Sequence, residues 1–229
     1  MLNYVIHLLL AISVTFSVHA ATARPTPTLA LLYDAVIPAL EGGNSVVYMV
    51  PFDATGTDDT SLPMWWKACH ATKQVSDKGM RQARAINQAL GRLNAVIGVV
   101  HTSELCTAMT SATYVAGRAR SQVYPTPDLD SPVIQNQMGL KDPVIQAKLA
   151  FVFRLRWVGT TTLMVGAKLT PDTAPHSVLT DLEPGDTAVF EVSDSGEIRL
   201  VARLTWQQWE EMGKYYLSKQ PKSKRLAKR

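Results

Sequence analysis

Short apolar runs and helical spacings alternate along this chain, and one apolar run organises the rest. Ser45 to Asp53 reads Ser-Val-Val-Tyr-Met-Val-Pro-Phe-Asp, with Gly-Gly-Asn before it and a polar loop after it. This pattern is typical of a buried central strand that ends at a loop. In open α/β sheets, ligands bind just past the carboxyl ends of such strands. Two apolar residues, Pro51 and Phe52, stand at this point of the chain. An account of the function must therefore explain why apolar residues occupy a predicted ligand site.

The pattern predicts that strands and helices alternate after this strand. Apolar runs predict strands over residues 95–102 and 160–167, and a hairpin of 187–192 with 197–204. Helical spacing predicts helices over residues 29–40, 75–93, 104–118 and 142–157, and a last helix capped by Thr205. Residues 61–70 are predicted to be a loop with large apolar anchors. The alternation indicates a single three-layer α/β/α sandwich with a mostly parallel central sheet, closed by the C-terminal hairpin.

The first 23 residues have the pattern of a secretory signal peptide. An apolar core over Leu8 to Val18 precedes small residues at Val18-His19-Ala20 and Ala21-Thr22-Ala23. Such a core is too short and wrongly flanked for a spanning helix. We therefore expect cleavage near Ala20 or Ala23 and a periplasmic or secreted domain over residues 24–220. The alternative is an uncleaved membrane anchor.

Charge adds little to this picture. The chain has 229 residues and a formal net charge of +4, much of it at the C-terminus. Residues 221–229 form a basic tail, which is either solvated or in contact with an anionic surface such as lipid headgroups or polyphosphate. Nucleic-acid binding is unsupported because no aromatic residues are interleaved with the charges. The charges of this tail are Lys222, Lys224, Arg225, Lys228 and Arg229.

No residue spacing indicates a metal site, and no cofactor is expected. His101 stands in a predicted strand between Val100 and Thr102, so we expect a structural role for it. His70 and His176 are isolated loop residues.

Several motifs resemble a known family when they are taken in order. They are Val46 to Val50, Trp66-X-X-Cys69, Val75-Ser76-Asp77-Lys78-Gly79-X-X-Gln82-Ala83, Thr102 to Cys106 with Ala108, Leu163 to Gly166, and Leu182 to Asp186. The ordered set resembles the histidine phosphatase superfamily, with its phosphoglycerate-mutase-like fold, and within it a secreted bacterial branch. No single motif is specific, but the set covers nearly the whole mature chain.

The resemblance implies a site whose key residues this chain lacks. In the family, a His after the first strand attacks phosphorus, and two Arg and a second His hold the phosphoryl oxygens. Here Phe52 stands at the nucleophile position and Pro51 at the position of the preceding Arg. Thr107 and Ala167 stand at the positions of the second Arg and the second His. Losing the nucleophile and the phosphate-binding groups together leaves no catalytic residue in the family's positions.

Four charged residues beside the matched motifs form a candidate rim of the old pocket: Asp53, Lys73, Glu104 and Lys168. Lys73 stands where this branch often has an Arg, and Lys168 follows Ala167. The alternative, that these are ordinary loop charges, is favoured because exposed charges are weak indicators of a site.

The two cysteines point to a disulfide. An even count in an exported protein favours pairing. Cys69 and Cys106 both stand where the secreted branch carries cysteines, so the resemblance implies that they pair. Closing a loop of roughly 37 residues would stabilise the fold by about 4 kcal/mol on chain-entropy grounds. Catalytic or redox use of these thiols is the alternative.

Three functions follow from this sequence. The first is a pseudophosphatase that binds a ligand or protein partner in the cell envelope. The second is a phosphomonoesterase with a rearranged active site, and the third is a structural component of an envelope assembly. The first is favoured over the second because a phosphate pocket without Arg or His lacks a strong oxyanion binder. The sequence does not separate the first from the third.

Overall fold

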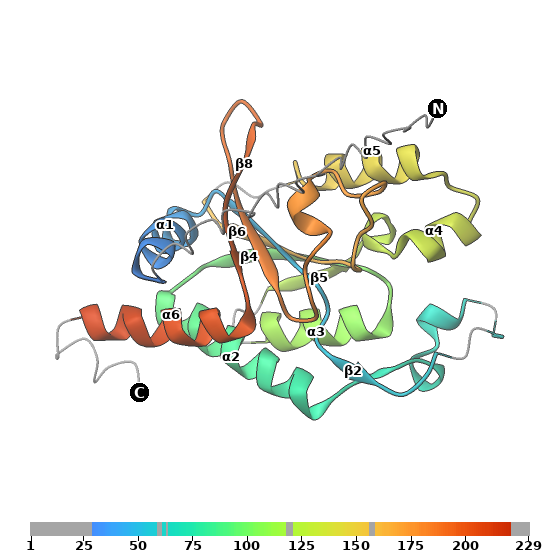
Figure 1. Cartoon of the computed structure of the whole chain (residues 1–229), viewed down its shortest axis with the longest axis horizontal. Helices are drawn as coiled ribbons and strands as arrows, with labels where there is room; N and C mark the ends of the chain where they lie inside the picture. Colours follow the sequence, from blue (N-terminus) through green and yellow to red (C-terminus); the bar gives the residue numbers. More distant parts are fainter. Residues whose placement is uncertain (1–28, 59–60, 63, 118–120, 156–158, 221–229) are drawn as a thin grey trace, which may run out of the picture.

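A six-stranded sheet forms the centre of the molecule (Figure 1). The computed structural model describes residues 29–58, 61–62, 64–117, 121–155 and 159–220. The strand order is β5-β4-β6-β1-β7-β8, in which β5, β4, β6 and β1 are parallel, β7 pairs antiparallel with β1, and β8 pairs antiparallel with β7. The predicted fold class, with a C-terminal hairpin closing the sheet, is confirmed. The strands are β1 Ser45–Met49, β4 Ile97–Thr102, β5 Gln122–Pro125, β6 Thr161–Val165, β7 Thr187–Val192 and β8 Ile198–Leu204.

The helices begin and end largely where the sequence signals them. Ser76 caps α2, because its side chain accepts a hydrogen bond from the Gly79 N–H, and Asn94 ends this helix in the left-handed conformation. Thr205 and Gln208 form a capping box at the start of α6. The α-helices are α1 Leu29–Gly42, α2 Asp77–Leu93, α3 Cys106–Ala116, α4 Pro132–Gln137, α5 Asp142–Val152 and α6 Trp206–Lys219.

Each face of the sheet carries its own core. Side chains alternate along β1, so that Val47 and Met49 join one buried cluster while Val46 and Tyr48 join the other. Helices α1, α2, α3 and α6 contribute to the first cluster, and α5 with the loops around residues 169–182 contributes to the second. Figure 1 shows α5 above the strands and α2 and α6 below them. The sheet is therefore the middle layer of three.

Some elements differ from the prediction. The predicted helix over 142–157 ends at Val152, and residues 156–157 lie outside the described residues. The sequence did not predict β5, α4 or the two-stranded sheet of β2 (Ala54–Thr55) and β3 (Gln74–Val75), all of which are six residues or shorter. The predicted loop over 61–70 contains two short 3-10 helices, η1 Trp65–Lys67 and η2 Cys69–Ala71. Two more follow later, η3 Pro127–Leu129 and η4 Ser177–Leu179.

The anchors of the 61–70 segment are as predicted: Trp65 and Trp66 are buried and pack with Ile134 of α4. The predicted signal peptide (1–23) and the basic tail (221–229) lie outside the described residues. Within the part of the chain that the structure describes, no helix has the length and apolar character needed to cross a membrane.

Candidate functional site

Three parallel strands end together at one edge of the sheet, and the four family positions follow them. In the strand register, Val165 of β6 lies opposite both Met49 of β1 and Thr102 of β4. The ladder continues past the strands, because Gly166 N–H donates to Met49 O at 3.1 Å and Ser103 N–H donates to Val165 O at 2.8 Å. The loops that leave this edge carry Pro51, Phe52 and Ala167, and Thr107 stands in the first turn of α3.

Phe52, at the nucleophile position, is part of the hydrophobic core. Only 2% of its surface is exposed, and it belongs to the buried cluster that contains residues of α2 and α3. Its backbone N–H donates to Ser111 Oγ at 3.0 Å, and Ser111 Oγ donates in turn to the Thr107 carbonyl at 2.6 Å. A Cβ added to Gly79 of α2 would stand 3.2 Å from the Phe52 Cβ. The ring is thus enclosed, and the half-buried Pro51 is the more accessible of the pair.

Ala167 is enclosed as well. It is 6% exposed, its N–H donates to the Leu129 carbonyl at 3.2 Å, and its own carbonyl accepts a hydrogen bond from the Tyr48 hydroxyl at 2.6 Å. Complete burial raises the pKa of Tyr48, so its hydroxyl stays protonated and donates this hydrogen bond. The preceding Gly166 is required by packing, because a Cβ there would lie 2.5 Å from the Tyr48 hydroxyl oxygen.

The loop over residues 182–186 is fixed against the end of β1. Val50 N–H donates to Asp186 O at 3.1 Å, and Gly185 N–H donates to Val50 O at 3.2 Å. Gln82 of α2 bridges the two segments, since its Nε2 donates to Pro184 O at 2.7 Å and its Oε1 accepts from Asp53 N–H at 2.9 Å. The last matched motif therefore docks directly on the first.

Asp53 pairs with the start of α2. Its Oδ2 accepts a hydrogen bond from Ser76 Oγ at 2.6 Å, and its Oδ1 lies 3.4 Å from Lys78 Nζ. The Ser76 hydrogen bond, helped by the Lys78 charge, lowers the pKa of Asp53, so this carboxylate is held in its ionised form. Asp53 thus stabilises the entry into α2.

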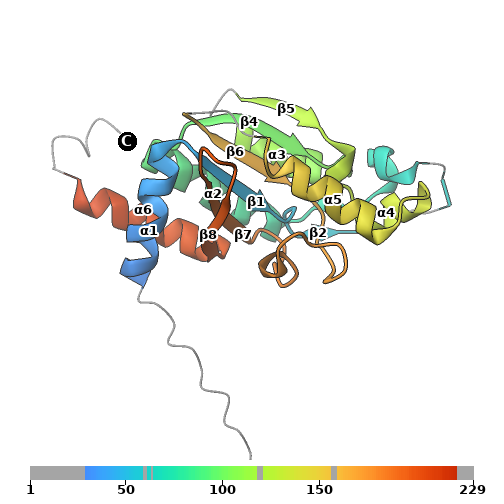
Figure 2. The ribbon, with the colours of Figure 1, turned by 90° about the horizontal axis from the view of Figure 1, so that it is seen from above.

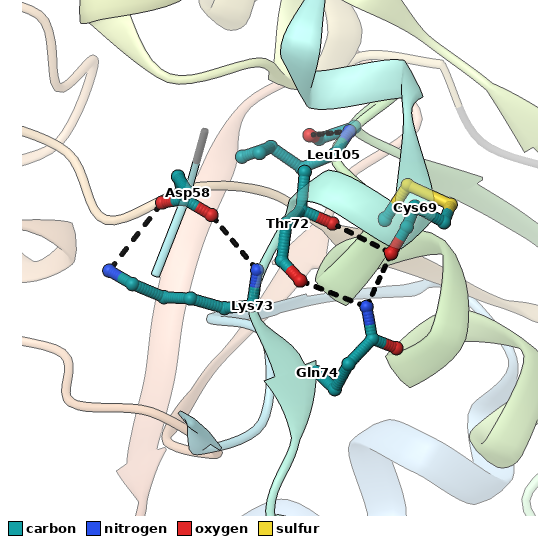
Figure 3. The surroundings of a disulfide bond; sticks show 8 residues. Asp58, Cys69, Thr72, Lys73, Gln74 and Leu105 are labelled. Carbon is teal, nitrogen blue, oxygen red and sulfur yellow. Dashed lines mark hydrogen bonds and ion pairs between the residues drawn. A yellow bond between two sulfur atoms is a disulfide. The ribbon is translucent and has the colours of Figure 1, made fainter. Parts of the chain in front are cut away.

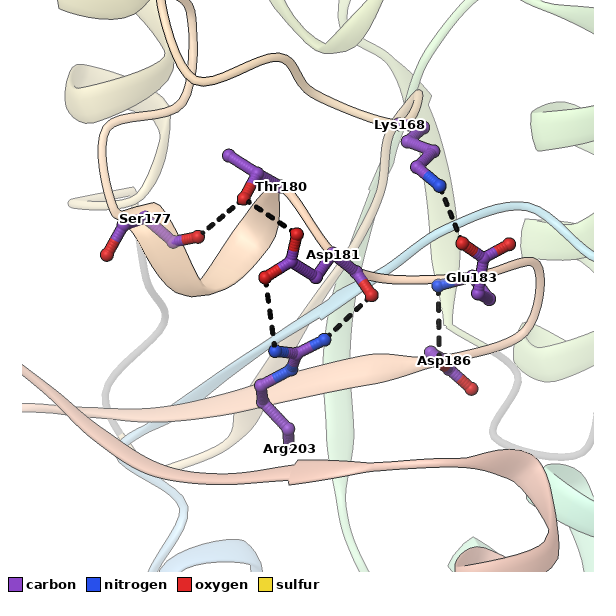
Figure 4. Close-up of polar contacts among 7 residues, drawn as sticks. All are labelled: Lys168, Ser177, Thr180, Asp181, Glu183, Asp186 and Arg203. Atoms are coloured by element: carbon purple, nitrogen blue, oxygen red, sulfur yellow. Dashed lines mark hydrogen bonds and ion pairs between the residues drawn. The ribbon is translucent and has the colours of Figure 1, made fainter. Parts of the chain in front are cut away.

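The other three candidate rim residues also have separate partners. Lys73 Nζ lies 3.5 Å from Asp58 Oδ2 (Figure 3). Glu104 Oε2 lies 2.7 Å from Lys67 Nζ, and Lys168 Nζ lies 2.6 Å from Glu183 Oε1 (Figure 4). Among the described residues, each rim charge is therefore neutralised by a neighbour outside the rim set.

Asp130 is a buried carboxyl that the sequence analysis missed. It has no exposed surface, and its Oδ1 accepts a hydrogen bond from Glu104 N–H at 2.7 Å. Burial raises the pKa of Asp130. No signal in the sequence marks it, because Asp-Leu-Asp-Ser between two prolines is typical of an exposed turn. Asp130 ties the loop after β5 to the loop that leads into α3.

Two histidines, His101 and His176, are partly buried against neighbouring side chains. His101 Nδ1 lies 3.1 Å from Thr126 Oγ1, and burial lowers the pKa of the ring. His176 lies against the rings of Phe153 and Phe190, and burial lowers its pKa too. In the described ranges, no group of three or more His, Cys, Asp or Glu side chains is placed to hold a metal ion.

The predicted disulfide is present. Cys69 of η2 is bonded to Cys106, the first residue of α3, with Cα atoms 5.3 Å apart (Figure 3). This bond fixes the segment with the buried Trp65 and Trp66 beside Thr107. Gln74 Nε2 adds a hydrogen bond to the Thr72 carbonyl at 2.9 Å in the same segment.

No family model and no curated protein matches this chain. Solved structures do. The protein histidine phosphatase SixA complexed with tungstate has 15% identity and a TM-score of 0.49, over 71% of this chain and 97% of that chain.

Two further solved structures also match this chain. Phosphoserine phosphatase from Entamoeba histolytica, in complex with 3-phosphoglyceric acid, has 11% identity and a TM-score of 0.49, over 72% of this chain and 98% of that chain. YhfR of Bacillus stearothermophilus has 15% identity and a TM-score of 0.46, over 69% and 95%.

Proposed function

We propose that this chain is an exported histidine-phosphatase-like protein without phosphatase activity, which acts by binding a ligand or a protein partner in the cell envelope. The observation that carries the proposal is Phe52. A side chain that is 2% exposed and packed in the core offers neither a lone pair nor a charge to a substrate at the nucleophile position.

The surroundings of Phe52 support the same conclusion. Pro51, Thr107 and Ala167 place no cation where the family holds phosphoryl oxygens, and a phosphoryl group needs strong cationic or N–H donors in the transition state. Lys168 and Lys73 do not replace them, since both are paired with acidic neighbours. A phosphomonoesterase with a rearranged site is therefore the weaker proposal.

Restoration of the family residues tests the loss of catalysis. The wild type is assayed with a generic phosphate ester beside Pro51→Arg/Phe52→His/Thr107→Arg/Ala167→His. The matched control carries Phe52→Asn with the same three other changes, so that it has the phosphate-binding groups without the nucleophile. We expect background turnover from the wild type and the control. Phosphate binding should be gained by both the four-fold variant and the control if they fold, as checked by circular dichroism.

Wild-type turnover that survives stringent purification would overturn the proposal whatever the variants do. In that case, single removal of Asp53, Glu104, Lys73 and Lys168 would identify the rearranged site. Export is tested separately by amino-terminal sequencing of the mature protein, where a start after Ala20 or Ala23 is expected. Recovery of an intact residue 1 in a membrane fraction would instead indicate an anchor.

Capture of partners from the envelope fraction addresses the binding role. A reproducible ligand or partner that is lost on changing Pro51, the accessible residue of the pair, supports binding at the old site. A partner that is retained by such a variant but lost when the basic tail is removed supports the structural alternative.

A further inference from the structure

Helix α5 carries apolar residues on two faces, and among the described residues only one of these faces is covered. Ile145, Leu149 and Val152 are buried against the sheet, as is Phe153 just after the helix. Val144 is 45% exposed and Phe151 is 62% exposed. In the ribbon views α5 lies at the outer margin of the molecule, and in Figure 2 no described element lies over it.

The exposed residues share one face of the helix. Val144, Lys148 and Phe151 are spaced by four and three residues, which places them one above another at 3.6 residues per turn. Leu155 follows shortly after the helix and is 38% exposed. A single exposed apolar residue is ordinary, but an aligned set that includes a largely exposed Phe indicates an interaction surface.

Basic side chains surround this apolar stripe. Lys141 precedes the helix and Arg154 follows it, both are exposed, and neither forms an ion pair with a described residue. Lys148 contacts Asp128 at 3.0 Å with 42% of its side chain exposed. Between residues 141 and 155 the only acidic residue is Asp142. Three basic side chains thus stand against two acidic ones, Asp142 and the Asp128 that pairs with Lys148, which leaves a net charge of +1 around the apolar stripe.

We propose that this face of α5 docks on the surface of an anionic lipid bilayer. Val144, Phe151 and Leu155 enter the headgroup layer, while Lys141, Lys148 and Arg154 contact lipid phosphates. Interfacial helices combine apolar residues with Lys and Arg in this way, because long basic side chains reach the phosphates while their stems lie against the apolar region. The positive charge favours an anionic lipid surface as the partner over a protein, for which the structure indicates no particular charge. The proposal does not depend on the loss of catalysis.

Vesicle co-sedimentation tests the proposal. The protein starts at Arg24, so that it contains every described element without the apolar leader, and vesicles are made of phosphatidylcholine with or without phosphatidylglycerol. Phe151→Ser is compared with Leu31→Ser, which changes an equally exposed residue (63%) on α1. Lys141→Gln/Arg154→Gln is compared with Arg81→Gln/Arg84→Gln, which removes the same charge from α2.

We expect binding only to vesicles that contain phosphatidylglycerol, about tenfold weaker for Phe151→Ser and for Lys141→Gln/Arg154→Gln, and unchanged for the two controls. Equal losses in variant and control, or no loss in either, would overturn the proposal and assign any binding to the basic tail. A dimer that forms without vesicles and is abolished by Phe151→Ser would also overturn it, because the face would then be a protein interface.

Discussion

The backbone N–H of Phe52 donates a hydrogen bond to the Ser111 hydroxyl, 3.0 Å away on α3. The same hydroxyl donates to the Thr107 carbonyl one turn earlier. Ser111 therefore satisfies the backbone donor of Phe52 and ties this residue to Thr107 in the first turn of α3. Phe52 and Ser111 are both buried, so bulk water cannot supply a hydrogen-bond partner for the Phe52 N–H or the Ser111 hydroxyl.

Ser111→Ala should lower the free energy of unfolding by about 1–3 kcal/mol, because it leaves the Phe52 N–H buried without a partner. Denaturant unfolding followed by Trp fluorescence measures this. The control is Thr113→Ala on the same helix, whose hydroxyl donates to Met109 O at 2.8 Å at an exposed position. It should cost no more than about 0.5 kcal/mol. Equal costs for the two variants would show that the Ser111 contact is not special.

Gly79→Ala should destabilise the fold by about 1–3 kcal/mol, although alanine is the better helix former. A Cβ at Gly79 would lie 2.3 Å from the Asp53 carbonyl oxygen and 2.7 Å from Val75 Cγ1, so the segment between β1 and β2 would have to move. Gly42→Ala is the control, because no atom lies within 4 Å of a Cβ there. Thermal unfolding should show a lower Tm for Gly79→Ala only. A rise in Tm for both variants would mean that the contact at Asp53 relaxes freely.

Removal of the Cys69–Cys106 disulfide should lower stability by about 4 kcal/mol, since it releases a loop closed over a sequence separation of 37. The comparison is unfolding of the wild type and of Cys69→Ala/Cys106→Ala, each with and without reductant. Only the wild type should respond to reductant. Two freely alkylated thiols in the unreduced wild type would contradict the pairing.

Much of the fold was predictable because its signals are local and strong. The apolar run of β1, the spacing of α2 after Ser76, and the Thr205 cap each determine an element by themselves. β5 and α4 were missed because four and six residues are too few to show a period, and β5 is a largely exposed edge strand.

The surroundings of the candidate site residues were harder to predict than the strands that precede them. The resemblance assigned Pro51, Phe52, Thr107 and Ala167 to the family's site positions, and in the structure they follow the carboxyl ends of β1, β4 and β6. The direction of the Phe52 side chain was not predictable, because it depends on the space that Gly79 and the small residues of α3 leave between two helices. Ion-pair choices such as Lys168 with Glu183 depend on how a distant loop folds back, which no local pattern encodes.

Asp130 should make the stability of the protein depend on pH. Burial raises its folded-state pKa, so the folded protein prefers the neutral carboxyl. The contribution of Asp130 to stability is therefore most favourable below its unfolded-state pKa of about 3.9 and is lost as pH rises through the raised folded-state pKa.

Asp130→Asn keeps an acceptor for Glu104 N–H but cannot ionise. We expect the stability of Asp130→Asn relative to wild type to increase between pH 3 and pH 7, as measured by urea unfolding across that range. Groups far from Asp130 are the same in both proteins, so the pH dependence of the difference comes from Asp130 and from its interactions with the nearby charges of Glu104 and Lys67. A difference that is constant with pH would mean that the Asp130 carboxyl pays no penalty for ionising in the folded state.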